Sequence, residues 1–438
     1  MLGGRVKPGR VWADASGRVC EHWCARAGVS GLAGSRGTVW SWQGLTRKTG
    51  TVRAACRVDR ETGWDAVEVW YSAQQVPASL GAAAGPGSVV TVGVFDGVHR
   101  GHRAVLDRVV ERAHEMAEGT GQGRVRPLAV AMTFDPHPRH VHHPEQRFAL
   151  ITSLTDRLAS LEEAGLDAVL VVTYDLDFAA QKPEEFVRTW LLGTLGARAV
   201  VVGDDVRFGR DNAGDASYLR RIGRAVGLDV EILGEVSSQE GRRWSSTWVR
   251  RCLEKGQVRE AADILGRPHR LRGRVVHGQR RGRELGFPTA NLDAATAGVV
   301  PADGVYAGWL VRGRRGEDAR SSENSENQGS GGREALGAQA VRKVGYQVER
   351  LPAAVSIGTN PTFDDVPQRT VEAHVLGRCD LDLYGEEVGV ELVEYLRPML
   401  AFDGLDPLLV QMRQDVAQTA QILGVPVPGP IRPEDVTA

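Results

Sequence analysis

Between residues 88 and 236 the sequence alternates between short apolar runs and longer stretches whose apolar residues fall on one helical face. The apolar runs are SVVTVGVF at 88–95, PLAVAMTF at 127–134, AVLVV at 168–172, ARAVVVG at 197–203 and LDVEILGEV at 228–236. Helical stripes cover 102–118, 152–164 and 183–196, and the last of these opens with proline and closes with glycine. Strands and helices that alternate at this spacing predict a parallel sheet covered by helices on both faces.

The pattern changes after about residue 268. Short strand candidates are now separated by Gly, Pro and Asp turns: LRGRVVHG, GVYAGWLV, AAVSIGTN, VEAHVLG and EVGVELVEYL. This texture predicts a compact, mostly antiparallel barrel or sandwich. A helix over 405–424 follows, and we expect it to pack on the barrel.

These changes of pattern divide the 438 residues into segments. We expect one domain over 67–265, a second over 266–426 and a tail over 427–438. Residues 1–66 are rich in Gly, Arg, Trp and Cys without a sustained period, which indicates a disordered leader or a translation start placed too far upstream. The CEHWC stretch at 20–24 has too few ligands for a zinc site. Residues 313–345 are polar and of low complexity, and we expect a disordered insertion there, outside the site.

Composition excludes several classes of protein. The formal net charge of −1 gives no global field that would draw the chain to nucleic acid or a membrane surface. No apolar stretch approaches the roughly 20 residues that span a bilayer. The five cysteines are odd in number and scattered, unlike a disulfide framework, so we expect a cytoplasmic protein.

The stretch VGVFDGVHRGH at 92–102 places its two histidines and two of its glycines, Gly97 and Gly101, where a strand passes into a helix. Gly97 and Gly101 allow the backbone to approach an anion, and the free N–H groups at a helix start favour phosphate. His99 and His102 can donate hydrogen bonds to phosphoryl oxygens as charge builds on them. The alternative is a pair of capping or core histidines.

A second anion site is predicted at SSTWVR, residues 245–250. Ser246 and Thr247 are expected to cap the helix that follows, and Arg250 falls one turn further on. Taken alone, this could equally be an ordinary helix cap. The segment TFDPHPRHVHHPE holds four histidines, but no carboxylate or Cys ligand stands at a clear spacing, so we favour a mobile substrate loop over a zinc site.

The segment 273–291, GRVVHGQRRGRELGFPTAN, suggests a different phosphate site. Its glycines can wrap phosphates through backbone N–H groups. Thr289 and Asn291 alternate onto one side of a strand and offer oxygen ligands for Mg²⁺ bound to a nucleotide. Glu372, in the apolar strand VEAHVLG, could take a proton from a substrate hydroxyl. The alternatives are a glycine-rich hairpin and a Glu on a solvated strand face.

The motifs GVFDGVHRGH, TFDPHPR (133–139), VVGDDVRFG (201–209) and SSTWVR occur in that order and resemble the FMN adenylyltransferase module of bacterial bifunctional riboflavin kinase/FAD synthetases. That module is an α/β nucleotidyltransferase of the HxGH superfamily with a Rossmann-like parallel sheet. The resemblance implies that His99 and His102 contact the ATP phosphates and stabilise the transition state. It assigns the nucleotide pocket to Gly93, Phe95, Gly97, Asp205, Ser246, Thr247 and Arg250, and the flavin side to Phe134, Asp135 and Pro136. The chain departs from the family pattern at Val206 and Trp248.

GFPTAN, GVYAG, SIGTNPTF, VEAHVLG and DLYGEEV resemble the riboflavin kinase module of the same enzymes, a β-barrel with a C-terminal helix. The resemblance implies that Thr289 and Asn291 bind the Mg-nucleotide and that Glu372 is the base for the ribityl 5′-hydroxyl. It places His277, Arg280 and Gly286 in the loop that covers the phosphates.

Together the resemblances imply that the chain phosphorylates riboflavin to FMN with ATP and Mg²⁺, and then adenylylates FMN to give FAD and pyrophosphate. The expected partners are ATP, riboflavin, FMN and FAD, without nucleic acid or membrane, and self-association is left open. One alternative is an HxGH nucleotidyltransferase for another phosphorylated metabolite. The other is a flavin- or nucleotide-binding regulator that has lost catalysis.

Overall fold

The computed structural model describes residues 67–82, 85–118, 126–146, 148–238, 241–278, 285–315, 346–358 and 369–429. The expected leader over 1–66 and the CEHWC stretch lie outside the described residues. So do residues 316–345 of the expected insertion and 430–438 of the expected tail.

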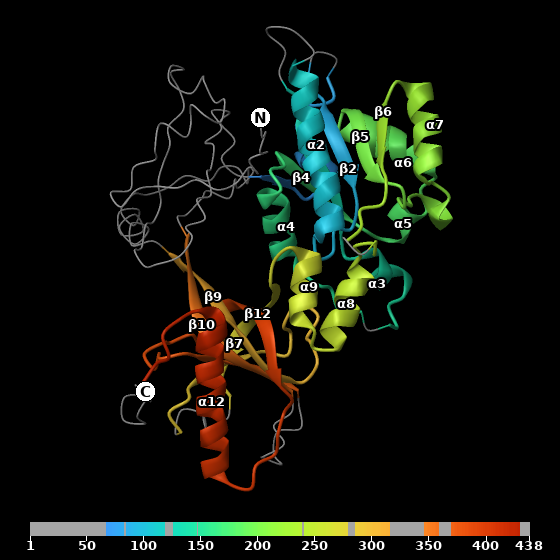
Figure 1. Cartoon of the computed structure of the whole chain (residues 1–438). Helices are drawn as coiled ribbons and strands as arrows, with labels where there is room; N and C mark the ends of the chain where they lie inside the picture. The colour runs from blue at the N-terminus through green and yellow to red at the C-terminus, as the bar shows by residue number, and fades with distance from the viewer. Residues whose placement is uncertain are drawn as a thin grey trace, which may run out of the picture. The chain divides into compact units, whose positions relative to one another are not determined.

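The first part of the described chain is a six-stranded sheet in the order β1-β4-β3-β2-β5-β6, with all neighbours parallel (Figure 1). The strands are β1 (Glu68–Trp70), β2 (Ser88–Val92), β3 (Leu128–Asp135), β4 (Ala168–Thr173), β5 (Ala197–Gly203) and β6 (Asp229–Leu233). The central residues of β2, β3, β4 and β5 are mostly Val, Ala, Leu and Met with almost no exposed surface, as expected for strands covered on both faces.

Helices lie between these strands in the sequence. They are η1 (Ala73–Gln75), α2 (Arg100–Glu118), α3 (Pro138–His142), α4 (Leu154–Glu163), α5 (Leu176–Ala179), α6 (Pro183–Phe186), η3 (Arg210–Asn212) and α7 (Ala216–Val226). Helix α6 continues as a π-helical segment, η2 (Val187–Thr194). Alternate strand residues point to two separate cores, so that Val169 packs with Leu106 of α2 whereas Leu170 packs with Leu191 of η2.

The strand order places a topological switch point between β2 and β5. The chain leaves β2 towards β3 and β4 on one side, then returns to add β5 and β6 on the other. Ligands bind outside the carboxyl ends of strands at such points. The residues that follow β2 and β5 are GVFDGVH and DD.

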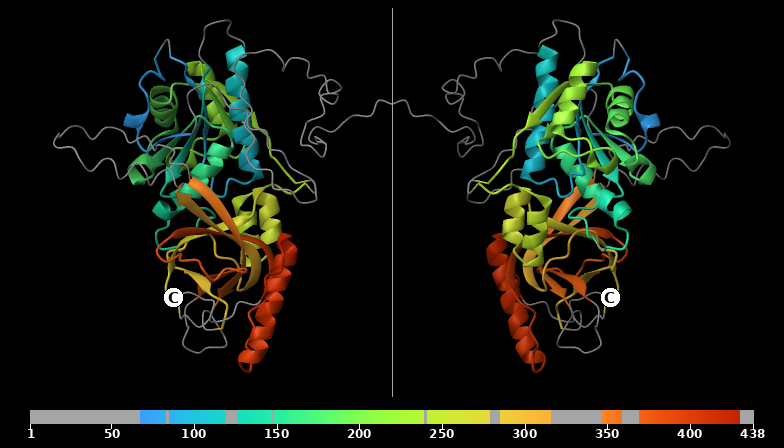
Figure 2. Two further views of the ribbon diagram at one scale, coloured as in Figure 1. Left: turned by 90° about the vertical axis from the view of Figure 1, so that its left-hand side faces the viewer. Right: turned by 90° about the vertical axis from the view of Figure 1, so that its right-hand side faces the viewer.

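The second part is a closed barrel in the order β10-β11-β8-β7-β12-β9, with every pair antiparallel. The strands are β7 (His269–Val276), β8 (Thr289–Leu292), β9 (Gly304–Arg315), β10 (Tyr346–Gly358), β11 (Thr370–Val375) and β12 (Glu387–Arg397). Helix α12 (Leu405–Leu423) lies along the outside of the barrel, as both views in Figure 2 show, and contacts β9 and β10.

Two helices connect the sheet to the barrel. These are α8 (Ser246–Glu254) and α9 (Val258–Leu265), and Figure 1 shows them between the sheet and the barrel. Their buried side chains, including Leu253 and Ile264, form one apolar cluster with barrel residues such as Leu271 and Val355. The helices therefore pack into the barrel core, although they precede it in the sequence.

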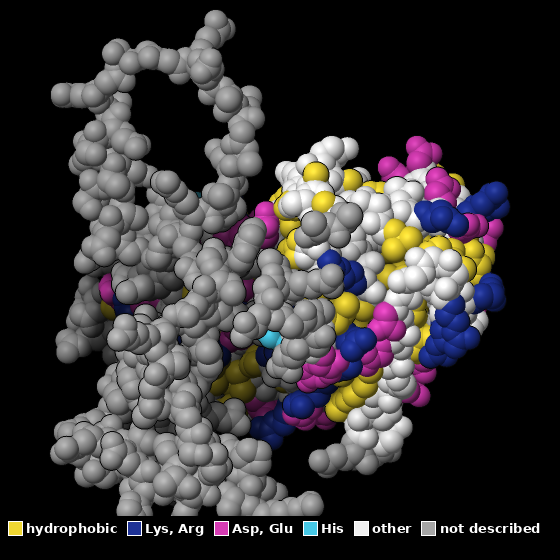
Figure 3. Space-filling view, turned by 90° about the horizontal axis from the view of Figure 1, so that it is seen from above, with side chains coloured by type: hydrophobic (Ala, Val, Ile, Leu, Met, Phe, Trp, Pro, Cys, Tyr) yellow, Lys and Arg dark blue, Asp and Glu magenta, His cyan; other side chains and the backbone are white. Residues whose placement is uncertain are grey.

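The predicted fold class is confirmed: a Rossmann-like parallel sheet is followed by an antiparallel β-barrel with a C-terminal helix. The predicted strand over 88–95 ends at Val92, because the chain then turns into the segment that leads to α2. The part of the chain that the structure describes has no helix with the length and apolarity needed to span a membrane. On the face shown in Figure 3, basic and acidic side chains of the described residues are interspersed.

Candidate functional site

A cavity of about 650 Å³ opens at the carboxyl ends of β2, β3 and β5. It is lined by residues at or just after the ends of these strands, among them Gly93, Phe95, His99, Phe134 and Asp205. Helix α2 contributes Gly101 and His102, and the start of α8 contributes Ser246. The cavity therefore lies at the switch point of the sheet, where the strand order predicts a ligand site.

His99 and His102 stack ring on ring in this cavity. Their centroids are 3.7 Å apart, and the edge of the His102 ring also meets Phe95 at 5.4 Å. The backbone N–H of His102 donates to Nδ1 of His99 at 3.3 Å, which places the proton of a neutral His99 on Nε2. Glycine at position 101 leaves room for this stack, because a Cβ atom there would lie 3.1 Å from the His99 ring.

Burial, and to a smaller extent the nearby positive charge of Arg243, lower the pKa of His99 to about 4. The pKa of His102 is also well below its usual value, first because of burial and then because of His99. Both rings are consequently neutral at physiological pH. Each neutral imidazole has one N–H to donate, and Nδ1 of His102 has no partner among the described residues.

Asp96, the aspartate of the FDG sequence, is buried and organises the loop. One carboxylate oxygen accepts from the N–H groups of Ile151 (2.9 Å) and Thr152 (3.3 Å), and the other is paired with Arg250. Ser246 Oγ donates to the Asp96 carbonyl at 2.9 Å. This aspartate holds three segments together rather than facing the cavity.

The predicted anion site at residues 245–250 differs from the expectation in its capping residue. The cap of helix α8 is Ser245, whose Oγ accepts from the N–H of Trp248 at 3.2 Å, so the prediction that Ser246 and Thr247 cap it was wrong by one residue. Ser246 lines the cavity, Thr247 is exposed, and Arg250 is engaged by Asp96 and lies over the Phe148 ring at 4.2 Å. Trp248, where the chain departs from the family pattern, stacks on Trp244 at 5.3 Å.

Asp205 follows β5 and is paired with Arg243, which reaches the cavity from the segment before α8. Arg243 also pairs with Glu235 at 3.5 Å, and Arg207 lines the same cavity. The pattern of the sequence did not predict either arginine as a site residue. Both stand in irregular segments, where hydrophobic periodicity carries no information.

The flavin side that the resemblance implies is aromatic. Phe134 at the end of β3 contacts Tyr174 (5.5 Å) and Phe178 (5.6 Å), and all three line the cavity. Asp135 and Pro136 do not line it, whereas Pro138 does. Tyr174 comes directly after β4, and this position at a strand end could have identified it.

The histidines after β3 are placed by separate contacts. His140 Nε2 lies 2.6 Å from the Phe148 carbonyl, and His142 Nε2 lies 3.0 Å from the Tyr174 hydroxyl. His137 Nδ1 accepts from the N–H of Arg139 at 3.0 Å. No group of three or more His, Cys, Asp or Glu that could hold a metal ion occurs among the described residues.

A smaller cavity of about 60 Å³ lies in the barrel and is lined by Gly278, Thr289, Asn291, Arg378 and Tyr384, among others. Asn291 Nδ2 donates to Thr289 Oγ1 at 3.2 Å, and Glu372 on β11 is directly opposite Asn291 on β8. The three residues predicted for phosphoryl transfer are thus brought together, although about 80 residues of sequence separate the strands that carry them.

The pKa of Glu372 is raised overall, because the effect of burial exceeds the opposing effect of hydrogen bonds from Thr370 and Thr289. Thr370 Oγ1 donates to Glu372 Oε1 at 3.2 Å, which orients the carboxylate. The donor set of hydroxyl, amide and carboxylate oxygens fits a hard divalent cation held together with nucleotide phosphates. Nitrogen and sulfur ligands, which zinc prefers, are not part of it.

The remaining predicted residues of this site are only partly described. The His277 ring lies against Tyr384 at a tilt of 34°, with ring centroids 3.9 Å apart, and Gly286 has a φ of 79° that favours glycine. Arg280 lies outside the described residues. The sequence did not predict Arg378 and Tyr384, which line the cavity from the segment after β11.

Comparison with known proteins accounts for both halves of the chain. A family model described as FAD synthetase matches residues 82–248, and one described as riboflavin kinase matches residues 265–423. The bifunctional riboflavin kinase/FMN adenylyltransferase of Escherichia coli K12 is 34% identical over 351 residues, which cover 80% of this chain and 97% of the relative. Its counterpart in Bacillus subtilis 168 is 30% identical over 334 residues, 75% of this chain and 90% of the relative.

A solved structure from Streptococcus pneumoniae, described as a macrolide-efflux protein, has the same arrangement. It is 27% identical, with a TM-score of 0.62, and the match covers 81% of this chain and 98% of that one. The parallel sheet with its histidine pair, the barrel with its Thr-Asn-Glu cluster and these relatives lead to one conclusion. The chain belongs to the family of bifunctional riboflavin kinases/FMN adenylyltransferases.

Proposed function

We propose that the chain converts riboflavin to FMN in the barrel and FMN to FAD at the sheet, using one ATP in each step. The observation that carries this is the presence of two separate cavities: the histidine pair lines the first, and Thr289 and Asn291 line the second, with Glu372 opposite Asn291 on the neighbouring strand. Neither reaction requires a covalent enzyme intermediate, so catalysis consists of positioning and charge stabilisation.

In adenylyl transfer, a phosphate oxygen of FMN attacks the α-phosphorus of ATP and pyrophosphate leaves. Negative charge builds on the oxygens of the α-phosphate during this step. His99 and His102 can each donate one N–H to them, and Arg243 adds a positive charge in the same cavity. The aromatic group formed by Phe134, Tyr174 and Phe178 offers a surface for the flavin ring.

In the kinase reaction, Glu372 takes the proton from the ribityl 5′-hydroxyl as its oxygen attacks the γ-phosphorus of ATP, and ADP leaves. We propose Mg²⁺ as the divalent cation, with Thr289 and Asn291 holding it beside the phosphates. The cation would neutralise charge that develops on the phosphate oxygens. Gly286 and His277 belong to the segment proposed to cover the phosphates.

The proposal is tested by incubating the purified chain with riboflavin, ATP and Mg²⁺ and separating the flavins over time. FMN should appear first and then give way to FAD and pyrophosphate. FMN without FAD would contradict the adenylyltransferase assignment. Flavin binding without any product would favour a regulator without catalysis. Omitting Mg²⁺, or supplying Mn²⁺ in its place, tests the identity of the cation.

We propose domain boundaries at residues 67, 265 and 426, and we keep the proposal that the chain works in the cytoplasm. The boundaries at 67 and 426 lie close to the start of β1 and the end of α12, and the boundary at 265 is the end of α9, whose apolar side chains pack with the barrel. The cytoplasmic location rests on the scattered cysteines. Limited proteolysis followed by mass measurement of the fragments tests the boundaries.

A further inference from the structure

We propose that Arg267, in the connection between the sheet and the barrel, is a positioning residue for adenylyl transfer, and that the docked barrel thereby shapes the FAD-forming site. The inference rests on the function proposed above. Its starting point is Gly97, which was expected to line the nucleotide cavity but lies behind it. The groups that hold Gly97 come from outside the strand and helix that it joins.

The segment between β2 and α2 has an unusual backbone. Phe95, Gly97 and Val98 have φ angles of 52°, 86° and 39°, all in the left-handed region. For a β-branched residue such as Val98 this conformation is costly, so it persists only where the surroundings determine it. His99 follows directly, and its ring position depends on this turn.

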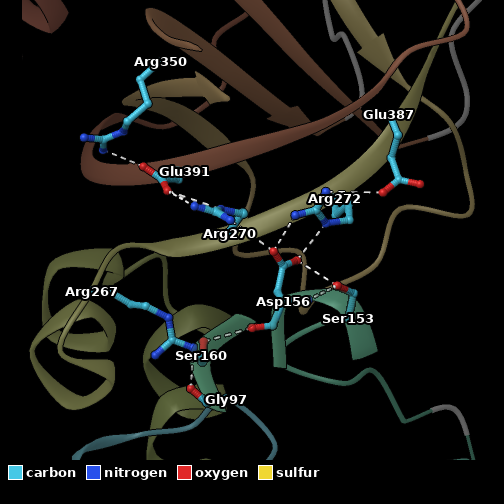
Figure 4. Close-up of polar contacts among 10 residues, drawn as sticks. All are labelled: Gly97, Ser153, Asp156, Ser160, Arg267, Arg270, Arg272, Arg350, Glu387 and Glu391. Atoms are coloured by element: carbon cyan, nitrogen blue, oxygen red, sulfur yellow. Dashed lines mark hydrogen bonds and ion pairs between the residues drawn. The ribbon is translucent and has the colours of Figure 1, made fainter. Parts of the chain in front are cut away.

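Arg267 holds the carbonyl side of the turn. Its Nη2 donates to the Gly97 carbonyl at 2.8 Å and its Nη1 donates to the Val98 carbonyl at 3.2 Å. Nη1 also reaches the Leu265 carbonyl at 3.2 Å, at the end of α9. Figure 4 shows Arg267 directed at Gly97. A guanidinium is suited to this task because its planar fork can donate to several acceptors at fixed angles.

Arg267 has no carboxylate at ion-pair distance among the described residues. A partly desolvated cation that donates to carbonyl oxygens gains less electrostatic energy than a cation paired with a carboxylate. The specific effect of Arg267 is therefore to fix the backbone of the turn. Pro268 restricts the backbone of Arg267 to extended conformations, and β7 of the barrel begins one residue later, at His269. The barrel therefore sets where this arginine stands.

A second connection holds the amide side of the same turn. The Gly97 N–H donates to Thr152 Oγ1 at 3.2 Å, and Thr152 directly precedes Ser153, the N-cap of helix α4. Asp156, in the first turn of α4, is bound by two arginines of β7. Arg272 contacts both of its carboxylate oxygens, at 2.6 and 2.9 Å, and Arg270 contacts one at 3.1 Å (Figure 4).

The barrel end of this connection is a chain of alternating charges. Arg270 also pairs with Glu391 of β12 at 2.5 Å, and Arg350 of β10 pairs with the other oxygen of Glu391 at 2.5 Å. Although burial acts to raise the pKa of Asp156, its hydrogen bonds and charge interactions with Arg272 hold that pKa at about 2. Asp156 is therefore ionised at every pH at which the enzyme would be assayed.

Gly97 is thus held from both sides by groups that depend on the barrel. Its carbonyl is bound by Arg267 directly, and its N–H is bound by a residue of the α4 start that β7 anchors. Displacing this turn moves the His99 ring relative to the α-phosphate, and misplacement by about 1 Å can cost about 100-fold in rate.

The test uses the full chain and measures two reactions separately: FAD formation from FMN, and FMN formation from riboflavin. In Arg267→Ala we expect kcat for FAD formation to fall about 10- to 100-fold. The KM for FMN and the rate of FMN formation should stay near those of the unsubstituted chain. Arg267→Lys should recover part of kcat, because an ammonium can reach one or both carbonyls without the fixed fork.

The matched control is Arg126→Ala. Arg126 pairs with Asp167 at 2.7 Å at the amino ends of β3 and β4. The substitution therefore removes a partly buried arginine of the same domain at a place away from the cavity. This variant should keep kcat for FAD formation. A second variant, Asp156→Asn, interrupts the other connection and should lower the same kcat by a smaller factor.

The outcomes separate the two proposals. If the unsubstituted chain forms no FAD from FMN, the proposed function fails. If it forms FAD and Arg267→Ala does so with the same kcat, the positioning role is overturned. A parallel loss of both activities, or a rise in KM alone, would also overturn it. Should Arg267→Ala not fold, Arg267→Lys and Asp156→Asn decide the question by the same split between kcat and KM.

Discussion

His99 and His102 perform their proposed task in the neutral state. Because burial places both pKa values well below 6.5, the free enzyme holds two imidazoles, each with a single N–H to donate. A neutral imidazole can donate a hydrogen bond to the negative charge that develops in the transition state. It carries no positive charge, so it does not bind other anions strongly before the reaction begins.

We predict that His102→Ala lowers kcat for FAD formation from FMN by about 100- to 1000-fold, the usual cost of removing one donor to a developing charge. FMN formation from riboflavin should persist, because Glu372 and the barrel cavity are untouched. Chromatography of the flavins measures both rates in one sample. Loss of both activities in this variant would show that the two-site assignment is wrong.

Glu372 gives the converse prediction. Glu372→Gln should abolish FMN formation while FAD formation from added FMN continues. In the unsubstituted chain, kcat/KM for riboflavin should be full at neutral pH and fall as pH decreases through the pKa of Glu372, since only the carboxylate can accept the proton. Because burial raises that pKa, the inflection should lie above about 4.3, the ordinary value for Glu. An inflection below this value would contradict Glu372 as the buried base.

At the scale of elements, the connection from β2 to α2 carries more of the chemistry than either element. Its shape is set by one glycine with positive φ and by contacts from α4, α8 and the segment before β7. In the barrel, the register of the antiparallel strands β8 and β11 brings Asn291 opposite Glu372.

Gly97→Ala tests the connection. A Cβ there would meet Ile151 and Leu265 at 3.1–3.2 Å, on a backbone with φ of 86°. We expect about 1–3 kcal/mol of lost stability and a fall in kcat for FAD formation. The control is Gly227→Ala, which has a φ of 74° and open space around the Cβ position at the end of α7. It should lose stability without losing FAD formation, and equal kinetics in the two variants would refute a special role for Gly97.

Many of the helices, strands and site motifs could be predicted from the sequence, because the apolar period and the motifs at strand ends are properties of neighbouring residues. The strands β2 to β6, the barrel texture and the clusters His99–His102 and Thr289–Asn291 were all accessible in this way. The strand β1 has three residues and shows no period. The contacts of Arg267 with Gly97, and of Asp156 with Arg272, join residues 170 and 116 positions apart, and only the folded backbone brings them together.

For the whole molecule, buried neutral histidines predict how stability depends on pH. His99 and His269 both have a pKa of about 4 in the folded chain, chiefly through burial, against about 6.5 when unfolded. Between these values the unfolded chain binds the proton and the folded chain does not, so stability falls as pH decreases from about 6.5 to 4. Each histidine contributes a slope of up to about 1.4 kcal/mol per pH unit in this window.

Urea unfolding at several pH values measures this slope. His269→Gln should lower the slope by the contribution of one histidine, because glutamine does not titrate and retains an N–H for the Val299 carbonyl, which His269 Nε2 approaches at 2.8 Å. A slope as large in His269→Gln as in the unsubstituted chain would contradict a lowered pKa of His269 in the folded chain.

The shared apolar cluster of α8, α9 and the barrel has a consequence for how the chain is made. A ribosome completes these helices well before it completes β12, the last barrel strand in the sequence. Until then, Val249, Leu253, Val258 and Ile264 lack most of the side chains that bury them in the finished protein. The nascent chain must carry this apolar surface through synthesis, and such transiently exposed surface is where aggregation begins and where chaperones bind.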